Sequence, residues 1–172
     1  MKRTALLVID PQNDYFEGGL FPLWNTQDTL ETILKAITHA QANDIPVVLI
    51  QHVADSSLGV APFFNPGTMG VEIHPQVLAL APNATVVMKH FADAFEQTEL
   101  NAVLSALKVE RLLLCGMMTQ NCVTHTALSK AAEEYDVKVI GEACTTREEM
   151  LHFIALNAIS IRVPCVSIKE SF

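Results

Sequence analysis

The sequence predicts a single-domain α/β protein whose parallel sheet is covered by helices on both faces. Short, continuously apolar runs alternate with segments in which apolar residues recur every three or four positions. The first pattern is typical of strands buried on both faces and the second of amphipathic helices. Strands that alternate with helices favour a parallel sheet in a three-layer α/β/α arrangement. The chain has 172 residues, half of them hydrophobic, which suits one compact domain over residues 1–172.

Five β-rich runs and a weaker sixth are expected to form the strands. They span residues 4–9, 46–50, 85–88, 111–115 and 137–140, with the weaker run at 159–163. These runs are predominantly apolar, whereas a half-exposed strand alternates polar and apolar residues. We therefore expect both faces of the sheet to be buried.

Four helices are expected between these strands. Two of them show the spacing i, i+3, i+4, i+7, in Leu30, Ile33, Leu34 and Ile37 and again in Leu100, Val103, Leu104 and Leu107. Thr26 and Thr98 are their expected N-caps. A third helix, after Cys122, is expected to bury Val123, Ala127, Leu128 and Ala131, and a fourth to bury Leu151, Ile154, Ala155 and Ala158.

Two connections, residues 10–25 and 51–84, are unusually long. Long loops in a compact domain are functional or disordered. These loops are rich in glycine and proline, yet they also carry five aromatic residues, namely Tyr15, Phe16, Trp24, Phe63 and Phe64. So much aromatic surface indicates ordered loops that shape a pocket for a small molecule.

Composition excludes several classes of partner. Eleven Lys and Arg against nineteen Asp and Glu leave a net charge of −8, with no basic run, which argues against nucleic acid and anionic membranes. No apolar run approaches the roughly 20 residues of a membrane helix. Because the first strand begins almost at Met1, there is no room for a leader peptide, and we expect a cytoplasmic protein whose four cysteines are reduced.

Three reactive side chains stand where apolar strands end. Asp10 and Lys89 each close a strand, and Cys122 opens the helix after another. Ligands bind at the carboxyl edge of open parallel sheets, so we expect the three side chains to meet there. A thiol attacks only as its thiolate, which a helix N-terminus and a lysine stabilise and a carboxylate helps to form. Backbone N–H groups between Gly116 and Cys122 can hold an oxyanion, since Gly116 permits an unusual backbone angle.

Each of these residues also has a purely structural interpretation. Asp10 can cap a turn before Pro11, and Lys89 can be a surface lysine at a strand end. Cys122 can be a small buried hydrophobe, as most free cysteines are. We expect that packing role for the other three cysteines, which are Cys115, Cys144 and Cys165.

Three segments together resemble the isochorismatase-like hydrolases, which include nicotinamidases and N-carbamoylsarcosine amidases. They are LLVIDPQNDYFEGG, MKHFADAFEQTELNAVLSAL and LLLCGMMTQNCVTHTA, in that order. The resemblance implies a six-stranded, Rossmann-like parallel sheet and a catalytic triad of Asp10, Lys89 and Cys122. It also implies a cis bond between Met117 and Met118, with the amides of Met118 and Cys122 as the oxyanion hole.

The sequence departs from nicotinamidases at their metal site. Their Asp-x-His pattern follows the second strand, but here Ile50 stands two residues before His52 in place of the acid. We therefore expect no catalytic metal and no cofactor. The resemblance is nearest to compact, metal-free cysteine hydrolases, several of which form dimers or larger assemblies, so we expect a homo-oligomer.

The main hypothesis is hydrolysis of a C–N bond in a small amide or carbamoyl compound through a thioester of Cys122. One alternative is vinyl-ether hydrolysis of isochorismate without the cysteine, although the two long loops have no Lys or Arg for its carboxylates. Another is a catalytically silent binding or assembly module. Candidate substrate contacts are Gln12, Tyr15, Phe16, Trp24, His52, Phe91, Phe95 and His125. The orientation of Glu72, Asp93 and Glu96 is left open.

Overall fold

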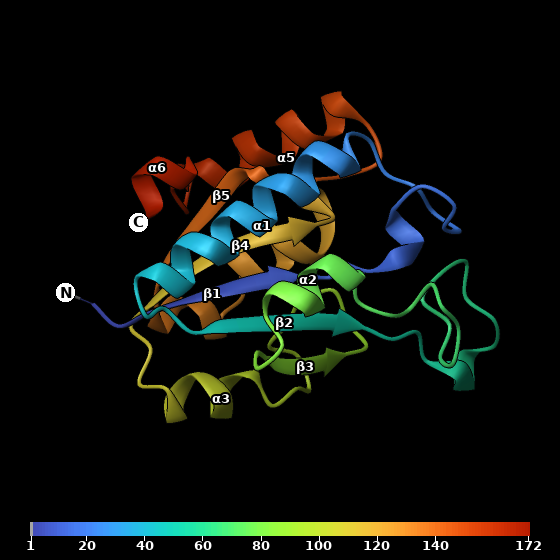
Figure 1. The fold of residues 1–172 in the computed structure, drawn as a ribbon, viewed down its shortest axis with the longest axis horizontal. Coiled ribbons are helices and arrows are strands. Elements are labelled where there is room, and N and C mark those ends of the chain that lie inside the picture. Colours follow the sequence, from blue (N-terminus) through green and yellow to red (C-terminus); the bar gives the residue numbers. More distant parts are fainter. Residues whose placement is uncertain (1) are drawn as a thin grey trace.

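The computed structural model describes residues 2–172 and contains one sheet of six parallel strands (Figure 1). In chain order these are β1 (Thr4–Ile9), β2 (Val47–His52), β3 (Thr85–Lys89), β4 (Arg111–Met117), β5 (Asp136–Thr145) and β6 (Cys165–Val166). Across the sheet they stand in the order β3-β2-β1-β4-β5-β6. The predicted three-layer α/β fold is confirmed. The strand order reverses between β1 and β4, and open parallel sheets bind ligands at such a reversal.

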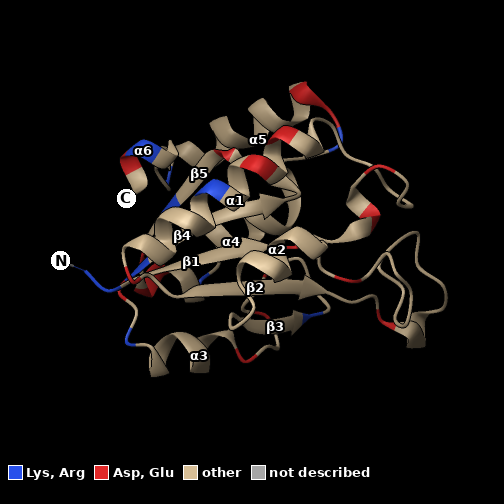
Figure 2. Cartoon of the chain, in the orientation of Figure 1, with Lys and Arg blue, Asp and Glu red and all other residues tan. Residues whose placement is uncertain are grey.

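Helices cover both faces of the sheet. They are α1 (Thr26–Ala42), α2 (Pro75–Leu80), α3 (Leu100–Ala106), α4 (Thr124–Ala127), α5 (Glu149–Ser160) and α6 (Ile168–Ser171). Short 3-10 turns span Asn13–Tyr15 (η1), Ser56–Leu58 (η2) and Ala131–Glu134 (η4), and a π-helix, η3, spans Thr119–Val123. In the view of Figure 1, α1 and α2 lie in front of the sheet, and Figure 2 shows α4 behind it.

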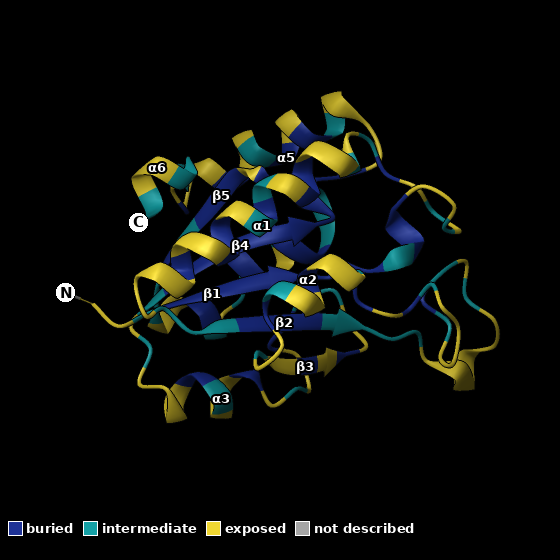
Figure 3. Cartoon of the chain, viewed as in Figure 1, coloured by how far each residue is buried: buried dark blue, intermediate teal, exposed yellow. Residues whose placement is uncertain are grey.

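The core runs along the two central strands. From Ala5 to Ile9 and from Leu112 to Cys115 every residue has zero exposure, as the dark strands of Figure 3 show. Burying one Val, Leu or Ile side chain contributes about 1.5–3 kcal/mol, so these two strands anchor the fold. They also hold the ends of β1 and β4 in fixed positions, where the polar residues follow.

We had expected strand β3 to be buried on both faces, but one of its faces is exposed. It is the edge of the sheet, where Val86 is 46% and Met88 is 55% exposed, while Val87 and Lys89 are buried. An apolar run does not reveal whether a strand is central or at an edge, because strand order is decided by pairing with segments far away in sequence. The strand itself forms where it was predicted, and only the predicted burial of its outward face was wrong.

The predicted sixth strand at 159–163 is wrong. Ile159 lies in the last turn of α5, and the strand forms later, at Cys165–Val166. Helix α5 is also turned from its predicted face, because it buries His152, Ala155 and Ile159 and leaves Ile154 59% exposed. Apolar residues surround this helix on most sides, so their spacing alone cannot select the buried face.

The helix after Cys122 and two caps also differ from expectation. The predicted long third helix is a π-helical turn, the four residues of α4 and then η4. Leu128 and Ala131 are only partly buried against the core. Asn25, not Thr26, occupies the N-cap of α1, and Glu99 occupies that of α3, where the Thr98 hydroxyl still accepts a hydrogen bond from the amide of Leu100 at 3.2 Å.

Charged residues are spread over the fold. Figure 2 shows Lys and Arg scattered over several elements, with no continuous basic stripe along one of them. Within residues 2–172, no helix is both long enough and apolar enough to cross a bilayer. All four cysteines are free thiols.

Candidate active site

The register of the sheet brings three polar side chains to one edge. Ile9 pairs with Ile50 on one side and with Gly116 on the other, and His52 pairs with Lys89. The carboxyl ends of β3, β2, β1 and β4 therefore lie side by side. Asp10, His52, Lys89 and Cys122 meet there, and we call these four residues the strand-edge cluster.

The ammonium of Lys89 lies at the centre of this cluster. Its Nζ is 2.9 Å from His52 Nδ1, 3.0 Å from the carbonyl oxygen of Phe91, 3.2 Å from Cys122 Sγ and 2.9 Å from Asp10 Oδ2. The side chains of Asp10 and Lys89 have zero exposure. Burial lowers the pKa of Lys89, but the charges of Asp10 and Cys122 outweigh that effect and raise it, so the lysine carries its charge.

An ammonium group has only three hydrogens for these four neighbours. The first three contacts have hydrogen-bond geometry, whereas the contact with Asp10 is an ion pair without it. Within the described part of the chain, neither carboxylate oxygen of Asp10 has a hydrogen-bond partner. Asp10 is thus held by charge but remains able to accept a proton.

The thiol of Cys122 is buried beside this carboxylate. Reactive atoms of Asp10, His52 and Cys122 all lie within 4.8 Å of one another. Burial raises the pKa of Cys122, and the charge of Asp10 raises it further against the opposing effect of Lys89. The raised pKa indicates that this environment on balance opposes ionisation of the thiol, although Lys89 by itself favours it.

His52 is neutral and points a ring nitrogen at Lys89. Burial and the charge of Lys89 lower its pKa to about 4. Because Nδ1 accepts from the ammonium, we assign the ring hydrogen to Nε2. His52 is the only partly exposed member of the strand-edge cluster.

The amide of Gln12 holds the backbone of His52 in place. Its oxygen accepts from the His52 amide at 2.8 Å, and its nitrogen donates to the carbonyls of His52 at 2.7 Å and Val71 at 2.6 Å. Gln12 is fully buried, so this side chain fixes the end of β2 and has no exposed surface for a substrate. We had considered Gln12 as a substrate contact.

Asp14 joins the two long loops. Its carboxylate accepts from the amides of Leu20 at 3.1 Å and Phe64 at 2.7 Å, and it is only 2% exposed. Gly70 packs against it so closely that a Cβ there would lie 2.0 Å from Asp14 Oδ1. Tyr15 and Phe64 pack edge to face, with ring centroids 4.6 Å apart. The loops therefore form one ordered wall beside the cluster.

The segment before Cys122 has an unusual backbone. Gly116 has a φ of 120°, and a Cβ there would lie 2.0 Å from the carbonyl oxygen of Ile9, so only glycine fits. The Met117–Met118 peptide is cis, and this is the bond for which the resemblance implies that form. Cys122 follows as the fourth residue of η3.

A second layer of polar contacts supports η3, and our sequence analysis missed it. The Thr119 hydroxyl lies 2.9 Å from Nδ1 of the buried His152, and the Thr146 hydroxyl donates to the Gln120 side chain at 2.5 Å. A histidine at a position that would face the core of an otherwise apolar helix is the only signal in the sequence. It could not be interpreted without knowing which face of α5 is buried.

The remaining candidate residues lie at different distances from the cluster. Burial raises the pKa of Tyr15, and the electrostatic effects of Cys122 and Asp10 raise it further. Phe91 supplies its carbonyl to Lys89, while its side chain is 40% exposed. Trp24 is half-buried, and its carbonyl accepts from the Thr145 hydroxyl.

Other candidates pack elsewhere or face solvent. Phe16 packs against His74 at 4.5 Å, and Phe95 stacks on Tyr135 at 6.1 Å, both measured between ring centroids. Three residues are exposed, namely His125, Glu72 and Glu96. Asp93 accepts a hydrogen bond from the amide of Phe95 at 2.9 Å.

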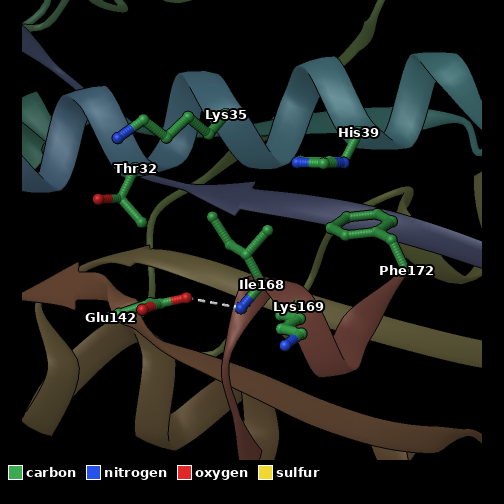
Figure 4. Close-up of a pocket in the computed structure, with 7 residues that line it drawn as sticks. All are labelled: Thr32, Lys35, His39, Glu142, Ile168, Lys169 and Phe172. Atoms are coloured by element: carbon green, nitrogen blue, oxygen red, sulfur yellow. Dashed lines mark hydrogen bonds between the residues drawn. The ribbon is translucent and has the colours of Figure 1, made fainter.

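A separate cavity of about 530 Å³ lies between α1 and the C-terminal helix α6 (Figure 4). His39 on α1 stacks on Phe172, with ring centroids 5.6 Å apart, and Glu142 accepts a hydrogen bond from the amide of Ile168 at 2.6 Å. Its lining contains no member of the strand-edge cluster and no cysteine. This cavity is therefore separate from the strand-edge cluster.

Comparison with known proteins decides the family. The isochorismatase domain matches residues 4–169. The chain belongs to the isochorismatase family. An uncharacterized isochorismatase family protein of Bacillus subtilis, YddQ, is 39% identical, with 98% of each chain covered. A crystal structure of an isochorismatase family protein from Desulfovibrio vulgaris superposes with a TM-score of 0.89 at 27% identity, covering 99% of this chain and 97% of that one.

Two further isochorismatase-family relatives have names that state an activity. A cysteine hydrolase from Pseudomonas syringae has a solved structure with a TM-score of 0.86 at 25% identity, covering 98% of this chain and 90% of that one. The ureidoacrylate amidohydrolase RutB of Acinetobacter baylyi is 27% identical over 83% of this chain and 71% of its own length. Family members are hydrolases, and some of them are amidases.

Proposed function

We propose that this protein hydrolyses a C–N bond in a small amide or carbamoyl substrate, with Cys122 as nucleophile and Asp10 as base. The observation that carries this proposal is the division of contacts around Lys89, whose hydrogens go to three other acceptors. The Asp10 carboxylate is left charged, without a hydrogen bond, and beside the Cys122 thiol. The activities named for the cysteine hydrolase and the amidohydrolase support this class of reaction.

In the first half-reaction, the proton of the Cys122 thiol passes to Asp10 while the sulfur attacks the carbonyl carbon. A C–S bond forms, and the carbonyl electrons become an oxyanion, which we assign to the amides of Met118 and Cys122. As the oxyanion collapses, the C–N bond breaks, and Asp10 returns its proton to the leaving nitrogen. Ammonia or an amine departs, and the acyl group stays on Cys122 as a thioester.

In the second half-reaction, Asp10 takes a proton from water. The resulting hydroxide attacks the thioester carbon, the C–S bond breaks, and the sulfur leaves with the proton that Asp10 had accepted. Lys89 stays charged throughout, so that negative charge on the sulfur or on Asp10 always has a partner 2.9 to 3.2 Å away. No cofactor takes part in these steps.

We further propose that the substrate contacts come from the partly exposed His52 and Trp24, the exposed Phe91 and the buried ring of Tyr15. His52 can donate through Nε2–H, and the rings of Tyr15, Trp24 and Phe91 offer apolar or aromatic surface. Such a pocket suits a small, uncharged substrate better than a dicarboxylate, because both long loops lack Lys and Arg.

The test begins with a screen of small amides and carbamoyl compounds for release of ammonia or amine. Activity found there should be lost in Cys122→Ala and Cys122→Ser and kept in Cys144→Ser, which changes a thiol that is equally buried but outside the cluster. Acid-quenched wild type should carry the acyl group on the peptide that contains Cys122. Turnover in Cys122→Ala would contradict the proposal.

The same variants separate the two alternatives. A vinyl-ether hydrolase of the isochorismate type would keep its activity in Cys122→Ala and lose it in Asp10→Asn, because only an acid is needed to protonate the substrate. A catalytically silent module would show no turnover with any compound, and calorimetry would detect binding of a small molecule without chemistry.

A further inference from the structure

The side chains around the Lys89 ammonium are also ligands that a transition metal uses. Asp10, His52 and Cys122 each offer one ligand atom, and these atoms lie within 4.8 Å of one another. Zn²⁺ takes carboxylate oxygen, imidazole nitrogen and thiolate sulfur at about 2.0–2.3 Å in a tetrahedron, which spaces the ligand atoms about 3.3–3.8 Å apart. The three side chains need to close by only about 1 Å to meet that geometry.

The position that a metal would take is occupied by a cation of the protein itself. Lys89 Nζ is 2.9 Å from Asp10 Oδ2, 2.9 Å from His52 Nδ1 and 3.2 Å from Cys122 Sγ. These distances exceed metal–ligand distances by less than 1 Å, as expected when an ammonium replaces an ion. The lysine has zero side-chain exposure, so no water shell separates it from the three ligands.

A second observation, independent of the lysine, also points to a ligand. Asp10 Oδ1 has zero exposure and no hydrogen-bond partner among residues 2–172. A buried carboxylate oxygen without a partner is costly, and a coordinated metal is one of the few groups that satisfies it. Asp10 Oδ1 is therefore available as a ligand atom for a metal that takes the place of Lys89.

We propose that Asp10, His52 and Cys122 form a zinc-binding site, and that the Lys89 ammonium fills this site in the resting protein and competes with Zn²⁺ for it. The ligand set of one oxygen, one nitrogen and one sulfur favours Zn²⁺ over Mg²⁺ or Ca²⁺, which prefer oxygen. His52 is partly exposed and provides the side from which an ion enters.

Lys89 opposes the metal in two ways. Its positive charge repels a dication at about 3 Å, and it donates a hydrogen bond to the same sulfur that the metal needs as a thiolate. Zinc that does enter would displace the lysine and consume the nucleophile. Lys89 therefore has a role besides catalysis, which is to keep inhibitory metals away from Cys122.

The first experiment compares zinc binding by wild type and Lys89→Met with titration calorimetry. Methionine keeps an unbranched, flexible side chain that is one atom shorter, and it removes the charge. We expect one Zn²⁺ per chain in Lys89→Met, with a Kd at least about 100-fold below that of wild type. Co²⁺ in place of Zn²⁺ should give the absorption of a tetrahedral thiolate complex. Equal zinc affinity in the two proteins would overturn the proposal.

Second-site variants identify the ligands. Adding Cys122→Ser or His52→Ala to Lys89→Met should weaken binding by more than the about 10- to 100-fold that loss of an outer-shell partner costs. Adding Cys144→Ser should leave the affinity unchanged, because that buried thiol lies outside the cluster and donates to the Ile140 carbonyl. Zinc bound equally well without Cys122 would contradict the assigned site.

A measurement on wild type covers the case in which Lys89→Met does not fold. Excess Zn²⁺ should slow iodoacetamide modification of Cys122, read by peptide mass spectrometry, and leave the partly exposed Cys165 unaffected. His52→Ala should remove this protection. No protection of Cys122, or equal protection in His52→Ala, would refute the site. Because every readout is metal binding or thiol modification, the outcome is independent of whether the protein is an amidase.

Discussion

Two Lys–Asp pairs lie at opposite ends of the strands of the sheet, and they have the same N–O distance. At the amino edge, Lys2 Nζ lies 2.9 Å from Asp136, which also contacts Arg111 at 2.9 Å, and the side chains are 28% to 52% exposed. At the carboxyl edge, Lys89 Nζ lies 2.9 Å from Asp10 with zero exposure of either side chain. Water screens the first pair and leaves the second almost unscreened.

Two ion pairs with the same N–O distance can therefore differ in strength and in their effect on neighbouring groups. Hydrogen bonds from Lys2 and Arg111 lower the pKa of Asp136, but solvent competes with them, and such pairs contribute about 0–1 kcal/mol. In the buried pair, each charge depends on its partner, and the neighbouring thiol is affected by both. Burial therefore couples the charges of Asp10 and Lys89 to each other and to the Cys122 thiol.

The largest effect is expected from removing the charge of the buried acid. Asp10→Asn keeps the shape of the side chain but cannot accept the thiol proton, so kcat should fall by about 10³- to 10⁴-fold. Asp136→Asn, the matched change at the other edge, should leave kcat unchanged. Steady-state rates on the amide found in the screen check both. A loss of less than tenfold would remove Asp10 from the role of base.

The next effect is on stability, when the buried lysine is removed. Lys89→Met leaves the Asp10 carboxylate buried without its partner, which should cost about 3–5 kcal/mol of unfolding free energy in urea denaturation. Lys2→Met at the exposed edge should change it by no more than about 0.5 kcal/mol. Combining Lys89→Met with Asp10→Asn should recover part of the loss, since no unpaired charge remains. Additive losses in the double variant would argue against coupling.

A smaller effect concerns acid and His52. Its pKa is about 4 in the fold against 6.5 for an ordinary histidine, so the unfolded chain takes up this proton first. His52 therefore destabilises the fold as pH drops from 6.5 to 4, by about 3 kcal/mol, and has no such effect above pH 6.5. His52→Asn should lack this part of the acid sensitivity. Equal slopes of stability against pH in both proteins would show that His52 titrates normally.

The smallest effect is expected at the exposed edge itself. Asp136→Asn should lower the unfolding free energy by less than about 1 kcal/mol at low salt. The difference should disappear at high salt, because at about 1 M the screening length is only about 3 Å. A larger or salt-independent loss would mean that Asp136 behaves like the buried pair.

Much of the fold was predictable because it depends on local patterns. Five of the six strands lie where continuous apolar runs indicated them, and α1 follows its i, i+3, i+4, i+7 spacing. Two of the wrong predictions, the burial of both faces of β3 and the buried face of α5, share one cause. The outward face of β3 and the buried face of α5 depend on which segment packs alongside, and nothing in residues 85–88 or 149–160 encodes that neighbour.

The sequence by itself determined that Asp10 and Lys89 stand at the ends of apolar strands and that Cys122 follows another such run by a few residues, at the start of a helical segment. Tertiary structure alone decided how they interact. Strand order and register placed His52 and the Phe91 carbonyl within hydrogen-bond distance of the Lys89 ammonium. Together with the contact to Cys122, these bonds use its three hydrogens, so Asp10 is held by an ion pair alone. Burial then raised the pKa of the Cys122 thiol, because desolvation is set by all the segments that close over a group and by no single one of them.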